Sequence, residues 1–318
     1  MVLRRSVQWF KPLLPVWAKR RIKEFLRSAV NPDAPPPAAS QRPVEFFPPG
    51  HFHSPVVDPE TINEDKHSSG TFHAREIPGI DLNEGGQVTL FEELSGYYDE
   101  LPFADEKSGD LRYHYVNGMY SYGDAIILYS MLRHFQPRRV VEVGSGFSSA
   151  LMLDVNERFL GNEIQLTFIE PYPERLNSLL RPGDRAELIE QGLQGVGDGV
   201  FEELQSGDFL FVDSSHVAKH CSDVNKLFFD ILPRLKTGVF IHFHDIFYPF
   251  EYPLAWLKRG ISWNEGYILR SFLMYNPNYR IRFFNHYFMG FHAERMKDKM
   301  PLMMKNPGGS FWLEKIQE

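Results

Sequence analysis

From residue 139 onward, short apolar segments alternate with segments of helical spacing, and this alternation limits the fold more than any other feature. Five segments are predicted to be strands: 139–143, 164–169, 186–190, 208–213 and 238–244. The segments predicted to be helices are 148–158, 173–180, 198–205, 217–232 and 263–275. Continuous apolar strands are typical of a parallel sheet that is covered on both faces. The sequence therefore predicts an α/β fold with a doubly wound, mostly parallel sheet and helices on both faces.

The rest of the chain predicts extensions around this sheet. Residues 1–30 are expected to form a basic amphipathic helix, and 31–50 form a linker that contains seven prolines. Residues 51–135 are interpreted as a helical and irregular lead-in that covers part of the core and includes a helix over 120–135. The remaining domain, 136–318, has an aromatic insertion at about 247–276, which we interpret as a wall of the acceptor site.

Charge is spread unevenly along the 318 residues. The net charge is −7, but residues 1–27 hold eight Lys or Arg and one acid, which gives +7 there and leaves −14 on the remainder. An acidic main body argues against nucleic acid as a partner. A basic amphipathic helix with tryptophans can make peripheral contact with an anionic membrane. The alternative is that residues 1–30 pack on their own domain or on a partner subunit.

The sequence carries few signals of localisation. Cys221 is the only cysteine, so no internal disulfide can form, and we expect a cytoplasmic protein. No apolar run has the length of a membrane span, and the N-terminus lacks the apolar region of a signal peptide. Peripheral contact with the inner membrane surface through residues 1–30 stays open, and no oligomeric state is predicted.

Ligands of such folds bind at the carboxyl ends of the strands, near the point where strand order reverses. The first strand ends in Glu142-Val-Gly144-Ser-Gly146, whose glycines permit a tight turn and close approach to the backbone. The second strand ends in Glu170, where a carboxylate can accept hydrogen bonds from ribose hydroxyls. Together they favour a nucleoside-containing ligand, although a purely structural strand–helix turn could account for the glycines.

Two further strand ends carry groups that can move protons or bind metals. Asp213 ends the fourth strand and His216 follows three residues later, a spacing that suits a base with its orienting group. Asp213 could instead cap the following helix. The fifth strand ends in His244-Asp245. Oxygen ligands there would favour Mg²⁺, and added imidazole would favour Zn²⁺, Fe²⁺ or Mn²⁺.

Taken together, these strand ends resemble class I S-adenosylmethionine-dependent methyltransferases over about residues 115–290. The likeness rests on VVEVGSGFSSAL, on the acid at 170, and on DFLFVDSSH followed by LPRLKTGVFIHFHDI. These last two segments are similar to the subgroup that methylates hydroxyls of sugars, macrolides and other small molecules. That subgroup includes cephalosporin-hydroxylase-like proteins. The stretches 115–133 and 249–273 also resemble a bacterial branch of this methyltransferase fold. The resemblance implies a Rossmann-like seven-stranded sheet and S-adenosylmethionine bound by Glu142, Gly144, Ser145, Gly146, Ser148, Glu170 and Asp213.

The resemblance also implies an activity, which is O-methylation of a hydroxyl on a small molecule or glycan. His216 is the expected general base, assisted by Asp213. The expected metal ligands are Asp213, His244 and Asp245, for Mg²⁺, Mn²⁺ or Zn²⁺, with a histidine at 244 where the subgroup often has a carboxylate. One alternative is a non-catalytic binding or assembly protein with the same fold. Another is a nicotinamide-dependent oxidoreductase, against which Ser149 replaces the third glycine of G-x-G-x-x-G.

Overall fold

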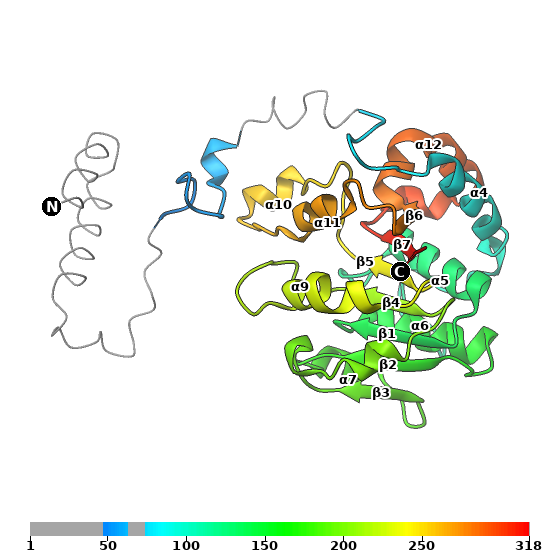
Figure 1. Ribbon diagram of the computed structural model, residues 1–318. Helices are drawn as coiled ribbons and strands as arrows, with labels where there is room; N and C mark the ends of the chain where they lie inside the picture. The colour runs from blue at the N-terminus through cyan, green and yellow to red at the C-terminus, as the bar shows by residue number, and fades with distance from the viewer. Residues whose placement is uncertain (1–46, 63–73, 318) are drawn as a thin grey trace, which may run out of the picture. The chain divides into compact units, whose positions relative to one another are not determined.

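The computed structural model describes residues 47–62 and 74–317 of the protein (Figure 1). These residues belong to two compact units that divide between Ile62 and Asn63. The predicted basic helix of 1–30 lies outside the described residues, as does the Pro-rich segment up to residue 46. In the first unit, the 3-10 turn η1 (Pro59–Thr61) is capped by the Asp58 side chain, which accepts a hydrogen bond from the Glu60 amide.

The second unit is built from seven strands and the helices that connect them. The strands are β1 (Arg139–Val143), β2 (Gln165–Ile169), β3 (Ala186–Ile189), β4 (Phe209–Val212), β5 (Phe240–Phe243), β6 (Tyr279–Phe284) and β7 (Phe311–Lys315). The α-helices are α4 (Glu84–Ser95), α5 (Tyr122–Phe135), α6 (Phe147–Phe159), α7 (Glu174–Leu179), α8 (Gly199–Glu202), α9 (Asp223–Lys226), α10 (Leu254–Lys258), α11 (Glu265–Leu273) and α12 (Asn285–Lys299). Shorter turns are η3 (Tyr98–Glu100), η4 (Leu193–Gly195), η5 (Leu227–Ile231), η6 (Leu232–Arg234) and η7 (Pro301–Lys305).

The seven strands form one sheet in the order β3-β2-β1-β4-β5-β7-β6. The pairs among β1 to β5 are parallel, and β7 runs antiparallel to both of its neighbours, β5 and β6. The predicted doubly wound, mostly parallel sheet is confirmed. All five strands predicted from apolar runs are present, with ends that differ by two residues or fewer.

Two predicted helices are shorter than expected. The helix predicted over 217–232 begins only at Asp223, because the Ser222 side chain accepts from the Asn225 amide and caps the helix there. The helix then widens into a π turn, η5, and tightens into a 3-10 turn, η6. The helix predicted over 198–205 shrinks to the four residues of α8. Residues 214–221 are thereby left as a loop at the end of β4.

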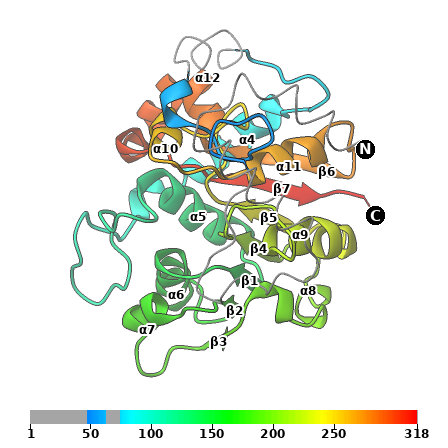
Figure 2. The same cartoon turned by 90° about the vertical axis from the view of Figure 1, so that its left-hand side faces the viewer.

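Side-chain alternation along the strands divides the core into two layers. Phe209 and Phe211 of β4 pack with α4, α5, α6 and α12 on one face, whereas Leu210 and Val212 pack with α9, η5 and α11 on the other. Figure 2 shows α5 and α6 on one side of the sheet and α8 and α9 on the opposite side. Burial on both faces explains why these strands are apolar throughout. Among the described residues, no helix combines the length and apolar character needed to span a membrane.

Candidate functional site

The carboxyl ends of four strands line up in one row. The pairing register aligns Ile169, Val143, Val212 and Phe243 across β2, β1, β4 and β5. The next residue of each strand therefore belongs to a second row, made of Glu170, Gly144, Asp213 and His244. Strand order reverses between β1 and β4, so this row crosses the switch point where open α/β sheets bind ligands.

Gly144 lets the ends of β1 and β4 approach each other closely. Its φ is +79°, and a Cβ atom at this position would lie 1.8 Å from the carbonyl oxygen of Asp213. Only glycine fits such a position without moving the backbone. The glycine of the predicted cofactor loop thus has a packing role, since it allows Asp213 to lie beside the loop.

Glu142 is fully buried and holds the start of α6. Its carboxyl oxygens lie 2.5 Å from the hydroxyls of Ser148 and Ser149, and the Ser149 hydroxyl accepts from the Gly146 amide. Burial raises the pKa of Glu142 to about 8, although the two serine hydroxyls act in the opposite direction. The structure therefore gives Glu142 and Ser148, both predicted to bind the cofactor, the task of shaping the cofactor loop.

Glu170 links the second strand end to the same loop. One of its carboxylate oxygens accepts from the Ser145 amide at 3.0 Å, and the other accepts from the Tyr172 amide at 2.8 Å. The Ser145 hydroxyl is buried and has no hydrogen-bond partner within the described part of the chain. A buried hydroxyl without a partner favours a polar ligand there, so Ser145 and Glu170 fit the adenosine-containing cofactor that the sequence predicts.

His216 is held at the same edge with its ring between carboxylates. Its Nε2 lies 3.3 Å from Asp213 Oδ1 and 3.9 Å from Asp245 Oδ2, and its Nδ1 lies 2.8 Å from Glu265 Oε2. Burial by itself would lower the pKa of His216, but hydrogen bonds and charges from Asp213 and Glu265 raise it well above the usual value. The predicted pairing of Asp213 with His216 is present in the structure.

Glu265 is a site residue whose role sequence reasoning missed. Its partnership with His216 leaves no signal in the spacing of the sequence, because the two residues are 49 positions apart. Trp263, just before α11, packs against the His216 ring with centroids 4.3 Å apart. The aromatic insertion thus supplies one wall beside the imidazole and the carboxylate that holds it.

Asp124, at the start of α5, is a second buried carboxyl near this edge that was not predicted. Its Oδ1 accepts from both the amide and the hydroxyl of Ser310, at 2.8 and 2.7 Å. Burial raises the pKa of Asp124 to about 6, and the nearby charge of His244 acts in the opposite direction. These hydrogen bonds hold the segment before β7 against the start of α5.

The predicted metal ligands do not fit a metal in the arrangement observed. Among residues 47–62 and 74–317, no group of three or more His, Cys, Asp or Glu side chains is placed to hold an ion. The Nε2 of His216 lies 3.3 Å from Asp213 Oδ1 and 3.9 Å from Asp245 Oδ2, so the imidazole contacts both carboxylates directly. His244 Nε2 is 3.6 Å from Asp245 Oδ1, and this contact pairs the two side chains directly.

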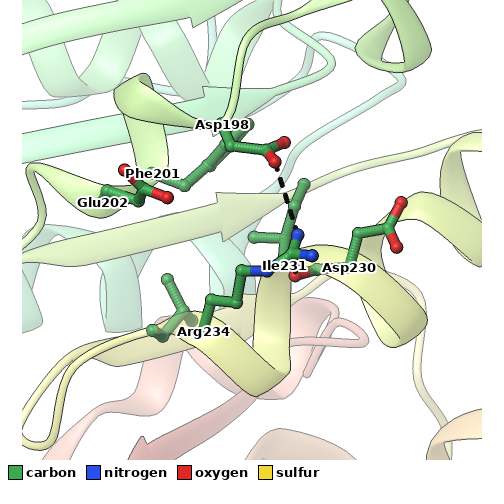
Figure 3. Close-up of a pocket in the computed structure, with 7 residues that line it drawn as sticks. Asp198, Phe201, Glu202, Asp230, Ile231 and Arg234 are labelled. Carbon is green, nitrogen blue, oxygen red and sulfur yellow. Dashed lines mark hydrogen bonds and ion pairs between the residues drawn. The ribbon is translucent and has the colours of Figure 1, made fainter.

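A separate small pocket lies away from these strand ends (Figure 3). Its lining residues lie in or directly beside α8, η5 and η6, which precede β4 and β5 along the chain, and Arg234 pairs with Asp198 at 3.3 Å. Its volume of about 10 Å³ accommodates at most one water molecule. It therefore takes no part in the candidate site.

Comparison with known proteins agrees with this geometry. A family model described as a methyltransferase domain matches residues 141–246, which contain all four strand ends. A protein of Archaeoglobus fulgidus named only as uncharacterized is 35% identical over 170 residues, which cover 51% of this chain and 75% of the relative.

Two solved structures are also similar. The SAH-bound methyltransferase PaMTH1 of Podospora anserina is 15% identical, with 80% of this chain and 97% of that chain covered and a TM-score of 0.40. A structure named cmcI-N160 SAH is 17% identical, with 49% and 78% covered and a TM-score of 0.33. At these scores we draw nothing further from either likeness. With the strand order, the row of strand ends and the domain match, the chain contains a class I S-adenosylmethionine-dependent methyltransferase domain.

Proposed function

We propose that the protein methylates a hydroxyl group of a small molecule or glycan, with His216 as the general base. The observation that carries this proposal is the position of His216 Nε2 at the carboxyl edge of the sheet, next to Asp213 and one strand away from the cofactor loop. A base at this place can reach an acceptor hydroxyl that approaches the end of β4. The non-catalytic and nicotinamide-dependent alternatives are not favoured by the family match.

Bound S-adenosylmethionine supplies a methyl group on a sulfonium sulfur, which leaves as a neutral thioether. The residues of the chain have to place the acceptor oxygen in line with that methyl, about 3 Å away, and most of the rate gain comes from this positioning. His216 Nε2 takes the hydroxyl proton as the new O–C bond forms. Asp213 then stabilises the imidazolium, at 3.3 Å from Nε2.

The electrostatics of the site set the pH dependence of this step. Because Asp213 and Glu265 raise the pKa of His216, the neutral imidazole that can accept a proton forms at higher pH than for an ordinary histidine. We therefore expect the turnover rate to increase as the pH rises above neutrality. A rate that falls over the same interval would contradict the assignment of His216 as base.

The first test is calorimetric titration with S-adenosylhomocysteine. We expect binding by the wild type and at least a tenfold weaker affinity for Glu170→Ala, because two loop amides lose their acceptor. Wild-type protein that does not bind S-adenosylhomocysteine would contradict the proposed function. After binding is shown, hydroxylated small molecules and glycans can be screened with a labelled methyl donor.

Substitution of the base follows once an acceptor is found. His216→Ala should lower kcat by about 10²- to 10⁴-fold and leave the affinity for S-adenosylhomocysteine within about threefold. His220→Ala is the matched control, because this histidine lies on the same loop and its ring contacts the exposed Cys221. Equal turnover by His216→Ala and wild type would refute the base assignment.

Two finer points need their own tests. The proposal includes no divalent metal, since the residues do not fit one, and titration of Mg²⁺, Mn²⁺ and Zn²⁺ in the presence of S-adenosylhomocysteine tests this. Binding that is lost in Asp245→Asn would overturn it. Peripheral contact of residues 1–30 with a membrane stays a prediction, which flotation of the full chain with anionic and neutral vesicles would check.

A further inference from the structure

We propose that Glu265 is the positioning residue of His216, and that its carboxylate fixes both the orientation of the ring and the nitrogen that carries the proton. This inference rests on the proposed role of His216 in methyl transfer. It concerns a residue that lies on α11, outside the 141–246 segment matched by the methyltransferase domain model.

Both oxygens of the Glu265 carboxylate are committed to the loop that carries His216. Oε2 lies 2.8 Å from His216 Nδ1, and Oε1 accepts from the Ser214 hydroxyl at 2.9 Å. The Ser214 hydroxyl in turn accepts from the His216 amide at 3.2 Å. The three residues therefore form a closed set of hydrogen bonds around the imidazole.

The backbone beside Glu265 clamps the same loop. The amides of Asn264 and Glu265 both donate to the carbonyl of His216, at 3.0 and 3.1 Å, and the Asn264 side chain accepts from the Ala218 amide at 2.6 Å. His216 has a φ of +58°, in the left-handed region that non-glycine residues seldom adopt. Such a conformation persists only where the surroundings enforce it, and the start of α11 supplies the enforcement.

The burial of the Glu265 carboxylate is unfavourable in free energy unless its contacts compensate for the loss of water. Glu265 is fully buried, and a buried carboxylate is tolerated only with strong partners. It is the first residue of the nine-residue α11, where the helix dipole favours negative charge, and the imidazole is its titratable partner. A neutral side chain would suffice if α11 only had to pack against the loop.

The contact also decides which nitrogen can act. A carboxylate only accepts hydrogen bonds, so His216 Nδ1 carries a proton, and Nε2 is the nitrogen that gains or loses one at the site. Trp263 packs against the ring and limits its rotation from another side. Glu265 thus holds the ring so that Nε2 points toward Asp213 and the strand ends.

The direct test is NMR of protein labelled with ¹⁵N-histidine, with the His216→Ala spectrum used to assign the ring signals. We expect an Nδ1-bound proton of His216 that is protected from exchange in the wild type and lost or strongly shifted in Glu265→Gln. Absence of that protected proton in the wild type would overturn the proposal without any variant. Identical His216 ring signals in wild type and Glu265→Gln would also overturn it.

Kinetics supply the second readout. Glu265→Gln should lower kcat by about 10²- to 10⁴-fold, while KM for S-adenosylmethionine stays within about threefold. Ser214→Ala keeps the carboxylate and should cost only about tenfold. Wild-type kcat in a folded Glu265→Gln protein would refute the positioning role. A wild type that fails to bind S-adenosylhomocysteine would instead refute the proposed function, and the NMR result would still decide whether Glu265 fixes the ring.

Discussion

The buried carboxyl of Glu142 should make the stability of this protein depend on pH in a way that one substitution removes. Glu142→Gln keeps the size of the side chain and its contacts with Ser148 and Ser149, but it cannot ionise. Because the pKa of Glu142 is raised to about 8 in the folded protein, from an ordinary value of 4.5, the folded state keeps a proton that the unfolded state loses. Stability from this group is therefore present below about pH 4.5 and is lost as the pH rises toward 8.

The size of the effect follows from the interval between the two pKa values. About 3.5 pH units, at roughly 1.4 kcal/mol per unit, correspond to a loss on the order of 5 kcal/mol between pH 4.5 and pH 8. This exceeds the 1–3 kcal/mol typical of a hydrogen bond whose partner is removed. The wild type should therefore lose stability relative to Glu142→Gln across this range.

Urea unfolding of both proteins at pH 5 and pH 8.5 measures the effect, and the difference between the proteins cancels the titration of all other groups. Ser148→Ala is the matched control, because it removes one hydroxyl from the carboxyl but leaves the ionisable group. It should be destabilised by about 1–2 kcal/mol at pH 5 and lose at least as much stability as the wild type between pH 5 and pH 8.5, because the missing hydroxyl no longer lowers the pKa of Glu142. A wild-type minus Glu142→Gln difference that stays constant from pH 5 to pH 8.5 would refute the reasoning.

Two further predictions concern the cofactor loop and the packing of α6. Gly144→Ala should weaken S-adenosylhomocysteine binding at least tenfold, because its Cβ would lie 1.8 Å from the Asp213 carbonyl oxygen. Gly109→Ala, which is also at positive φ but in open space, should leave the affinity unchanged. Calorimetric titration measures both affinities, and equal values for the two variants would contradict the prediction. Arg112→Met should lower the free energy of unfolding by about 3–5 kcal/mol, because the buried carboxylate of Asp154 loses its ion pair with the guanidinium 2.7 Å away. Urea unfolding measures this loss, and a value below about 1 kcal/mol would contradict the prediction.

Apolar runs made most of the sheet predictable. β1, β4 and β5 are buried on both faces along almost their whole length, so their sequences are largely apolar stretches that stand out from the helices. β6 escaped because Arg280 and Arg282 interrupt its pattern, and β7 was missed with it. The late start of α9 depends on a single side chain, Ser222, whose capping role is one of several that a serine can take.

The site was predictable where it depends on strand ends. Parallel strands finish at one edge of a sheet, so Glu170, Asp213 and His216 could be expected to meet once the strands were placed. Glu265 and Asp124 reach the same edge through helix packing, which leaves no periodic trace in the sequence. The structural role of Glu142 could not be predicted either, because it depends on where the hydroxyls of Ser148 and Ser149 lie in three dimensions.

The position of β7 has a consequence for how the protein is made. β7 is the last strand in the sequence, yet it lies inside the sheet between β5 and β6. During synthesis, β5 therefore keeps an unpaired edge until residues 311–315 have left the ribosome. The contact of Ser310 with Asp124 forms at the same stage. A chain interrupted before this point would contain the whole cofactor loop but would expose the unpaired edge of β5. Such an edge can pair with other chains, so the fragment would be prone to aggregation.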